Sequence, residues 1–437
     1  MELIHHLRLS ASICGFIIQY RFMWLVCQIG AREHYAVARA LEARGRLAAL
    51  LTDFWVTPGS VFSHLPGGRR LRDRFHAGLE EASVVAPNAR MLAFELRQRL
   101  EKRRGWPVIR ERNRGFQRWA MGKLDSLAPD SWILSPDPSL LAPLGTSGTA
   151  RRSVPTLFSY SYAARDLFRS AKARGWTTVL GQIDPGPEEE RIVAEEHQRY
   201  PHLGSSWQPA PPEYWENWRE ELELADRVLV NSEWSRQCLL KEGVPAEKLE
   251  IAPLVYQVGT DRRAVRDSIE HSTSNIQHSR ATRVLFLGQI ILRKGIGRLL
   301  DAMRLLRNES VELILAGPAE IDATTWADLP NVHWIGPVPR SEVGSIYQNA
   351  DCFILPTLSD GYALTQLEAL AHGLPVIASK HCGAAVTHGQ NGWILEDLEP
   401  ETIAEAIRTA MQERPPEVRP PEFSLDDLAD RLLTSDL

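Results

Sequence analysis

The chain has 437 residues, of which 44% are apolar and 24% are charged, a composition typical of a soluble globular protein. Its formal net charge of −5 gives no overall reason to expect nucleic-acid binding. Because a single core rarely grows beyond about 250–300 residues, the length predicts two domains of about 200 residues each.

The first 22 residues precede the first clear strand pattern. An apolar patch over residues 13–20 is interrupted by Arg21, short of the roughly 18–20 residues that a membrane span requires. No small-residue cleavage site of a secretory signal follows it. We expect residues 1–22 to be an upstream extension of a natural start at Met23, which N-terminal sequencing of the native protein would test.

The first half of the chain begins with a unit typical of a Rossmann-like domain. A strand over residues 24–28 leads to a turn at Gly30 and a helix over 33–44, which Gly45 caps before a strand over 47–52. The following residues, up to about position 150, are rich in Arg, Pro and Gly and give no clear pattern.

A basic segment lies within that stretch. Residues 97–118 carry nine Arg or Lys side chains against two Glu, with Trp106 and Phe116 between them. A solvated helix face is one explanation, and docking on anionic lipid or an anionic acceptor is the other. We expect a cytoplasmic protein, in peripheral contact with the inner face of the membrane if the second explanation holds.

Regular structure returns in the rest of the first half. Strands are expected over 178–183, 227–231 and 249–253, and a helix over 233–242. Asn231-Ser232 precedes this helix, where Ser232 suits an N-cap. A polar stretch rich in His, Ser and Arg then predicts a linker. We place an N-terminal domain at 1–260 and the linker at 261–282.

The second half alternates short strands and helices, which predicts a doubly wound parallel sheet. Strands are expected over 284–288, 311–316, 332–335, 352–355 and 374–378, and helices over 297–307, 341–348 and 364–372. Ligands of such sheets bind beyond the carboxyl ends of the strands, where Gly288, Gly317 and Asp360 fall. We place this domain at 283–413 and a proline-broken tail at 414–437.

Two acids near the C-terminus, Asp360 and Glu368, are separated by seven residues. Asp360 falls in a turn and Glu368 on the next helix, with the free N–H groups of the helix's first turn between them. The N-terminus of a helix that follows a glycine is a common phosphate-binding site, and carboxylates bind hydroxyl groups well. The spacing by itself would also be explained by two solvated acids at the surface. Together, the two carboxylates and the phosphate-binding helix start imply a ligand that is a phosphate ester carrying sugars.

This segment resembles the signature of retaining GT-B glycosyltransferases, the large family (glycosyl transferases group 1) that includes glycogen synthases and mannosyltransferases. The matching residues are Asp360, Glu368, Ala369, Ala371, Gly373, Pro375, Val376 and Ile377. Residues 288–295, Gly-Gln-Ile-Ile-Leu-Arg-Lys-Gly, are similar to the family's donor-phosphate element, commonly Gly-Arg followed by Lys-Gly. Lys294 matches the lysine, whereas Gln289 stands at the usual arginine and the adjacent Arg293 is a candidate replacement.

The resemblance implies an α/β GT-B fold, in which two Rossmann-like doubly wound domains face a cleft. It implies that Glu368 holds the ribose of a nucleotide-sugar, Asp360 a hydroxyl of the transferred sugar, and Lys294 the leaving diphosphate. It implies further donor contacts from Gly288, Gln289, Arg293, Gly361, Tyr362, Ala363 and Leu364, the last four through backbone N–H groups.

The resemblance also implies how transfer proceeds. The acceptor hydroxyl would attack on the face that the phosphate leaves, and the phosphate would accept its proton, so no general base, metal or separate cofactor is expected. The sequence has no Asp-x-Asp, P-loop or nucleophile elbow, and its five scattered cysteines predict neither a disulfide framework nor a metal site.

The acceptor side is implied more loosely. A saccharide or glycolipid acceptor is expected, as in polysaccharide biosynthesis, and Gly30 is placed like the family's first-domain glycine loop. His34 would contact the acceptor or the sugar, with a surface or packed histidine as its alternative. The run from Leu180 to Glu190 is expected on this side without an assigned role, and the helical run 425–433 would cross back to the first domain.

Three departures from the family pattern leave alternatives open. The family usually has Glu and Gly where this chain has Asp360 and Ala363, which implies a differently shaped sugar pocket. Together with Gln289, these residues leave two other hypotheses open: a nucleotide-sugar epimerase or hydrolase of the same fold, and a sugar-nucleotide-binding protein without catalysis.

Overall fold

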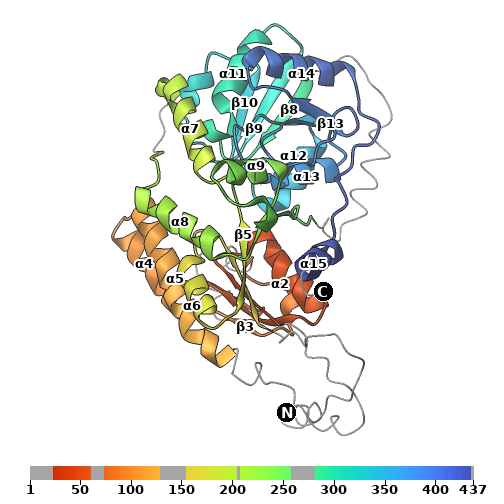
Figure 1. The fold of residues 1–437 in the computed structure, drawn as a ribbon. Helices are drawn as coiled ribbons and strands as arrows, with labels where there is room; N and C mark the ends of the chain where they lie inside the picture. The colour runs from red at the N-terminus through yellow and green to blue at the C-terminus, as the bar shows by residue number, and fades with distance from the viewer. Residues whose placement is uncertain (1–22, 61–72, 128–153, 204–206, 257–280, 435–437) are drawn as a thin grey trace, which may run out of the picture.

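The computed structural model describes residues 23–60, 73–127, 154–203, 207–256 and 281–434. The expected upstream extension and most of the expected linker lie outside these residues. Within them the chain forms two parallel sheets, each covered by helices (Figure 1). The expected fold class, two Rossmann-like domains, is confirmed.

The first domain holds a seven-stranded sheet in the order β3-β2-β1-β4-β5-β6-β7. Its strands are β1 Trp24–Gln28, β2 Leu47–Thr52, β3 Val84–Val85, β4 Thr156–Tyr160, β5 Thr177–Gln182, β6 Arg227–Val230 and β7 Leu249–Ile251. β1 and β4 are buried at every residue, as expected of strands that helices cover on both faces.

The second domain holds a six-stranded sheet in the order β10-β9-β8-β11-β12-β13. Its strands are β8 Thr282–Leu287, β9 Val311–Ala316, β10 Val332–Gly336, β11 Cys352–Leu355, β12 Val376–Ser379 and β13 Gly392–Leu395. Every pairing between these strands is parallel. The carboxyl ends of all six strands therefore meet at one edge, where the candidate site lies.

Helices cover both sheets, and no helix in the described part of the chain combines the length and apolar character needed to span a membrane. Those of the first domain are α2 Ala36–Ala43, α4 Asn88–Leu100, α5 Trp106–Leu127, α6 Arg165–Ala173, α7 Pro187–Arg199, α8 Pro212–Leu224 and α9 Glu233–Lys241. Those that follow are α11 Ile296–Leu305, α12 Val343–Gln348, α13 Leu364–Ala371, α14 Pro400–Gln412 and α15 Leu425–Leu433.

The last helix, α15, packs beside α2 of the first domain (Figure 1). A capping box at Ser424 starts the helix, and its apolar face buries Leu428 and Leu432 in the core that also contains Leu41. Arg44 of the first domain lies 2.8 Å from the Asp430 carboxylate. The C-terminal segment thus joins the two domains a second time.

Helix α7 belongs to the first domain by connectivity but packs into the second. The side chain of Tyr200, just after its end, lies in the core of the second domain and donates a hydrogen bond of 2.8 Å to Asp301. Glu196, only 2% exposed, is paired with Arg298 of α11 at 2.9 Å. These buried contacts hold the two domains in a defined relation along α7.

The helix expected at 33–44 begins later than predicted, at Ala36. Glu33, His34 and Tyr35 have φ angles of 50°, 50° and 61°, in the left-handed region. Such backbone costs roughly 1–3 kcal/mol per residue and persists only where the surroundings impose it. Here the buried ring of Tyr35 is held against Trp55, with centroids 5.4 Å apart.

Candidate functional site

The two domains meet at the loop that follows β11. Trp234 of α9 donates a hydrogen bond of 3.2 Å to the Ser359 hydroxyl and stacks on His381, with ring centroids 4.0 Å apart. Gly361 lies against Ile183 and Asn231 of the first domain so closely that a Cβ atom there would be 2.2 Å from the Ile183 carbonyl oxygen. The Asp360 loop therefore lies between the facing edges of the two sheets.

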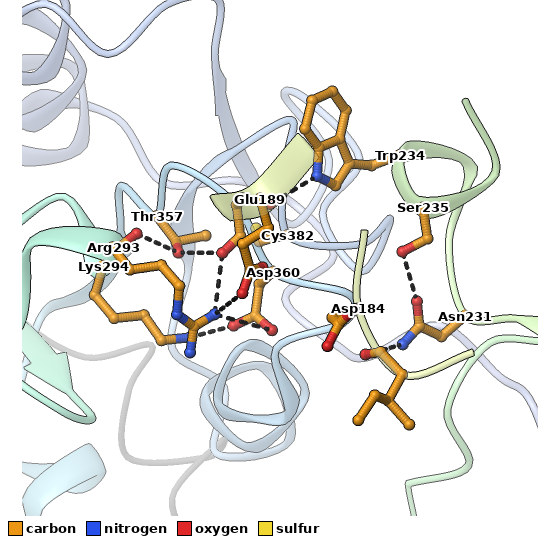
Figure 2. Close-up of polar contacts among 12 residues, drawn as sticks. Asp184, Glu189, Asn231, Trp234, Ser235, Arg293, Lys294, Thr357, Asp360 and Cys382 are labelled. Carbon is orange, nitrogen blue, oxygen red and sulfur yellow. Dashed lines mark hydrogen bonds and ion pairs between the residues drawn. The ribbon is translucent and has the colours of Figure 1, made fainter. Parts of the chain in front are cut away.

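A cluster of opposite charges lies at this loop (Figure 2). The Lys294 ammonium forms an ion pair with the Asp360 carboxylate, and the Arg293 guanidinium lies 3.9 Å from the same carboxylate. The Lys294 and Asp360 side chains are only 14% and 19% exposed. The structure thus brings together three of the residues that the sequence singled out.

The loops that carry this cluster are joined through their backbones. The Leu358 N–H and the Thr357 hydroxyl both donate to the Arg293 carbonyl, at 2.9 and 3.2 Å. Gly295 permits the approach, because it has a φ of +73° and a Cβ atom there would be 1.9 Å from the Pro356 carbonyl oxygen. Lys294 and Asp360 are therefore held in place by a tight loop contact.

Two acids that the sequence did not assign approach the cluster from the first domain. Glu189, in the first turn of α7, lies 3.6 Å from the Arg293 guanidinium. Burial raises its pKa to about 8; Asp184 and Asp360 add to the shift, and Arg293 opposes it. Asp184 follows β5, and burial raises its pKa also. The run of acids after Pro187 was the signal in the sequence, but it did not indicate a partner.

Glu368 lies on α13, apart from this cluster. The Tyr347 hydroxyl donates to its carboxylate at 3.1 Å. Burial raises the pKa of Glu368, while the hydrogen bond from Tyr347 and the charge of Arg340 oppose the shift. A half-buried carboxylate with one hydroxyl partner retains acceptor capacity for ligand hydroxyls.

The donor-loop residues do not all match their expected role. Tyr362 is buried against Gly383, where an added Cβ atom would be 2.6 Å from its ring. The N–H of Ala363 donates a hydrogen bond of 3.0 Å to the Cys382 carbonyl. This amide is therefore already engaged, which corrects the expectation that it binds the nucleotide-sugar. Leu364 begins α13.

The other expected glycine element, Gly288-Gln289, lies at the end of β8. Gly288 is packed so closely against Gly317 that a Cβ atom on the latter would be 1.9 Å from the Gly288 carbonyl oxygen. Gln289 is exposed. It follows β8 and so lies at the carboxyl edge of the sheet.

On the acceptor side, the N–H of Gly30 already donates to Asp53 at 2.8 Å, which makes this glycine part of a structural turn. His34 lies across from the second domain, with its Nε2 atom 3.2 Å from an Arg340 nitrogen. Burial and the charges of Arg340 and Arg39 lower the pKa of His34. A neutral imidazole can accept this hydrogen bond from Arg340.

The described residues contain no group of three or more His, Cys, Asp or Glu side chains that could hold a metal ion. Four of the five cysteines, Cys27, Cys238, Cys352 and Cys382, are buried free thiols, and Cys14 lies outside the described residues.

Residues 281–413 match the family model described as Glycosyl transferases group 1. The amylovoran biosynthesis glycosyltransferase AmsK of Erwinia amylovora is 25% identical over 234 residues, 50% of each chain. The D-inositol 3-phosphate glycosyltransferase of Corynebacterium urealyticum is 29% identical over 205 residues, 42% of this chain and 48% of that protein. The capsular polysaccharide biosynthesis glycosyltransferase CapM of Staphylococcus aureus is 32% identical over 133 residues, 28% and 34% of the two chains. The chain spans about half or less of the length of these curated relatives.

Solved structures are similar over nearly the whole chain. Anabaena Alr3699/HepE in complex with UDP has a TM-score of 0.52 at 14% identity, covering 94% of this chain and 95% of that one. The lipopolysaccharide outer core galactosyltransferase WaaB has a TM-score of 0.55 at 13% identity, covering 95% and 100%. The chain thus has the two-domain GT-B fold of these solved structures, and its second domain matches Glycosyl transferases group 1.

Proposed function

We propose that this chain is a retaining glycosyltransferase that moves a sugar from a nucleotide-sugar donor to a hydroxyl of a saccharide or lipid-linked acceptor, without a metal ion. The observation that carries the proposal is the cluster of Lys294, Arg293 and Asp360 between the facing edges of the two sheets. The family match, which covers all three residues, supports it.

The two cations suit the leaving group. As the bond between the anomeric carbon and the phosphate oxygen breaks, negative charge accumulates on the diphosphate, and Lys294 and Arg293 would stabilise it. The acceptor oxygen forms the new bond to the same carbon on the same face, and its proton passes to the departing phosphate. The cations thereby supply the charge stabilisation that a metal would otherwise give.

The carboxylates suit hydroxyl groups. Asp360 would accept a hydrogen bond from the transferred sugar, and its contact with Lys294 supports a position of that sugar beside the diphosphate. Glu368, one turn into α13, would accept from the ribose hydroxyls. The names of AmsK and CapM, from amylovoran and capsular polysaccharide biosynthesis, support a saccharide acceptor. The UDP complex of HepE makes UDP-sugars the first donors to test.

A donor and acceptor screen tests the function, with the Glu368→Gln variant measured beside the wild type. We expect transfer that resists EDTA, and a loss of kcat/KM by about 10–100-fold in the variant, because a hydrogen bond to a charged group contributes roughly 1.5–3 kcal/mol. Glu401→Gln, an exposed change on α14, is the matched control. Conversion of the donor alone would indicate an epimerase or hydrolase, and tight nucleotide binding without turnover would indicate a binding protein.

We also propose peripheral contact with an anionic membrane through residues 97–118. Five of the nine cations there have acidic partners, but the other four have no ion pair among the described residues: Arg99, Lys102, Arg104 and Arg118. Leu100, beside the first three of these at the end of α4, is 84% exposed. Sedimentation with phosphatidylglycerol vesicles should capture the wild type but not Arg99→Glu/Arg104→Glu. Equal capture of both, or none by either, contradicts this proposal.

A further inference from the structure

A cavity of about 210 Å³ opens between the domains next to the charge cluster. One wall comes from the first domain and includes Tyr162, Tyr214 and Trp215, and the opposite wall includes Arg293 and its neighbours in the β8–α11 loop. One water molecule takes roughly 30 Å³, so the cavity has room for a larger ligand. It adjoins the proposed reaction centre because Asp184, Glu189 and Arg293 also line it.

The aromatic side chains of the first-domain wall form one connected group. Tyr162 stacks on Tyr214 with centroids 4.8 Å apart, and Trp106 and Trp215 pack on Tyr214 at 4.7 and 5.2 Å. All four side chains line the cavity and are neither fully buried nor fully exposed. Rigid rings of this kind present a flat apolar surface and lose little entropy when they bind a ligand.

The position of Tyr162 is enforced by its surroundings. Its φ of +73° lies in the left-handed region, which is costly for a bulky residue. The buried Glu221 carboxylate accepts its N–H at 2.7 Å, Asn113 donates to its carbonyl at 2.8 Å, and its hydroxyl donates to Asp184 at 2.5 Å. Strain that the surroundings maintain at a cavity wall favours a functional role for this ring.

Hydrogen-bonding groups lie beside the rings. Of the two Glu189 carboxylate oxygens, Oε2 is buried without a hydrogen-bond partner among the described residues. Asp184 lines the same cavity as Arg293. Its carboxylate accepts hydrogen bonds from the Tyr162 hydroxyl and, at 2.9 Å, from the Gly186 N–H. Figure 2 shows both acids beside the Lys294–Asp360 pair.

Apart from the tyrosines, the titratable groups of the lining are mostly carboxyl groups. Asp184, Glu189, Glu190 and Glu320 line the cavity, against the single guanidinium of Arg293. Burial already disfavours the ionised forms of Asp184 and Glu189 here, and it would disfavour a ligand carboxylate or phosphate in the same way, because the anion would lose its hydration. Hydroxyl groups, by contrast, can donate to carboxylates and accept from a protonated carboxyl.

We propose that this cavity binds an uncharged sugar ring of the acceptor, with the apolar face of the ring against Tyr214 and Trp215 and its hydroxyls on Asp184 and Glu189. This inference rests on the proposed function and narrows it, because it excludes uronic acids and phosphorylated sugars as the acceptor unit nearest the reaction centre. The cavity would discriminate neutral sugars from charged ones through the cost of placing an anion in it as much as through contacts to the neutral ring.

The test compares ligands that differ in one group. Methyl glucoside, galactoside and mannoside, and the matching methyl uronides, are titrated by saturation-transfer NMR against the wild type, with and without saturating UDP. We expect at least one neutral glycoside to bind, and its uronide to bind at least about 10-fold more weakly. Tyr214→Ala should weaken the neutral ligand about 10-fold, whereas Tyr214→Phe, which keeps the ring, and Trp119→Phe on α5, outside the cavity lining, should not.

The outcomes separate this inference from the proposed function. Binding of a neutral glycoside with the expected discrimination, in a protein that transfers no sugar from any nucleotide-sugar, would support the cavity and overturn the function. Sugar transfer without glycoside binding up to about 20 mM, or with uronides bound equally well, would overturn the cavity assignment alone. The comparison of glycoside with uronide uses the wild type only, so it stands even if Tyr214→Ala does not fold.

Discussion

Replacing Lys294 with alanine is expected to lower kcat for sugar transfer by about 10²–10³-fold, the usual cost of removing one preorganised group that stabilises developing negative charge. Lys294 is only 14% exposed and is held by its loop contact and by Asp360, so little reorganisation is needed when charge appears on the leaving phosphate. A loss confined to KM would instead indicate that Lys294 binds the donor equally in the ground and transition states. Steady-state kinetics with the donor found in the screen measures both constants.

Loss of stability must be separated from loss of chemistry in this variant. Lys294→Ala leaves the Asp360 carboxylate, which is 19% exposed, with only the more distant Arg293 as a cation, and this is destabilising in its own right. The double variant Lys294→Met/Asp360→Asn removes both charges together, and we expect it to unfold at nearly the wild-type temperature yet remain inactive. Lys123→Ala, an exposed change on α5, controls for loss of a positive charge elsewhere. A double variant with wild-type turnover would show that the donor phosphate lies elsewhere.

The parts of the fold that sequence patterns predicted are those in which local signals and burial agree. The strands β1, β2 and β9 have the bounds expected for them, because each is a short apolar run buried between helix layers. Strand β4 was missed, although it lies at the centre of the first sheet. Its sequence, Thr-Leu-Phe-Ser-Tyr, mixes polar and apolar residues, and Ser159 is buried because β4 lies inside the sheet, between β1 and β5, rather than because of its own character.

The long helix α5 was expected only in part, as a solvated helix face within residues 97–118, and for a different reason. Only a narrow stripe of it is buried, at Gln117 and at the apolar residues Phe116, Ala120 and Leu124. The three apolar positions are four residues apart, a helical spacing that the surrounding arginines obscured. The residues with left-handed backbone before α2 show the opposite error, because a helix was predicted there and does not form. The local sequence favours a helix, and the packing of Tyr35 overrides it.

The same distinction applies to the candidate site. Lys294 and Asp360 could be expected to meet, because each follows a strand of one parallel sheet and the carboxyl ends of such strands share an edge. Glu189 could not, because it reaches Arg293 from the other domain. Contacts between domains depend on how two finished units dock, and no pattern local to either segment encodes them.

Gly361→Ala is expected to lower the rate of transfer by about 10²-fold, because a displacement of about 1 Å at a reacting centre has an effect of this size. Gly361 does not have a positive φ, so alanine there is not strained by its own backbone. Its Cβ atom would instead be 2.2 Å from the Ile183 carbonyl oxygen and 2.6 Å from the Asn231 amide nitrogen, both in the first domain. The change therefore acts on the docking of the domains.

The distinguishing result is a split between catalysis and nucleotide binding. Lys294 and Glu368 both belong to the second domain, so affinity for a nucleoside diphosphate should stay within a few-fold of the wild type while transfer is lost. Gly122→Ala on α5, where an added Cβ atom meets nothing within 4 Å, is the matched control and should change neither quantity. Small-angle scattering should show a more open pair of domains for Gly361→Ala alone. Parallel loss of nucleotide binding would instead mean that the substitution disrupts the second domain, whereas wild-type transfer would mean that catalysis does not require the contact between Gly361 and Ile183.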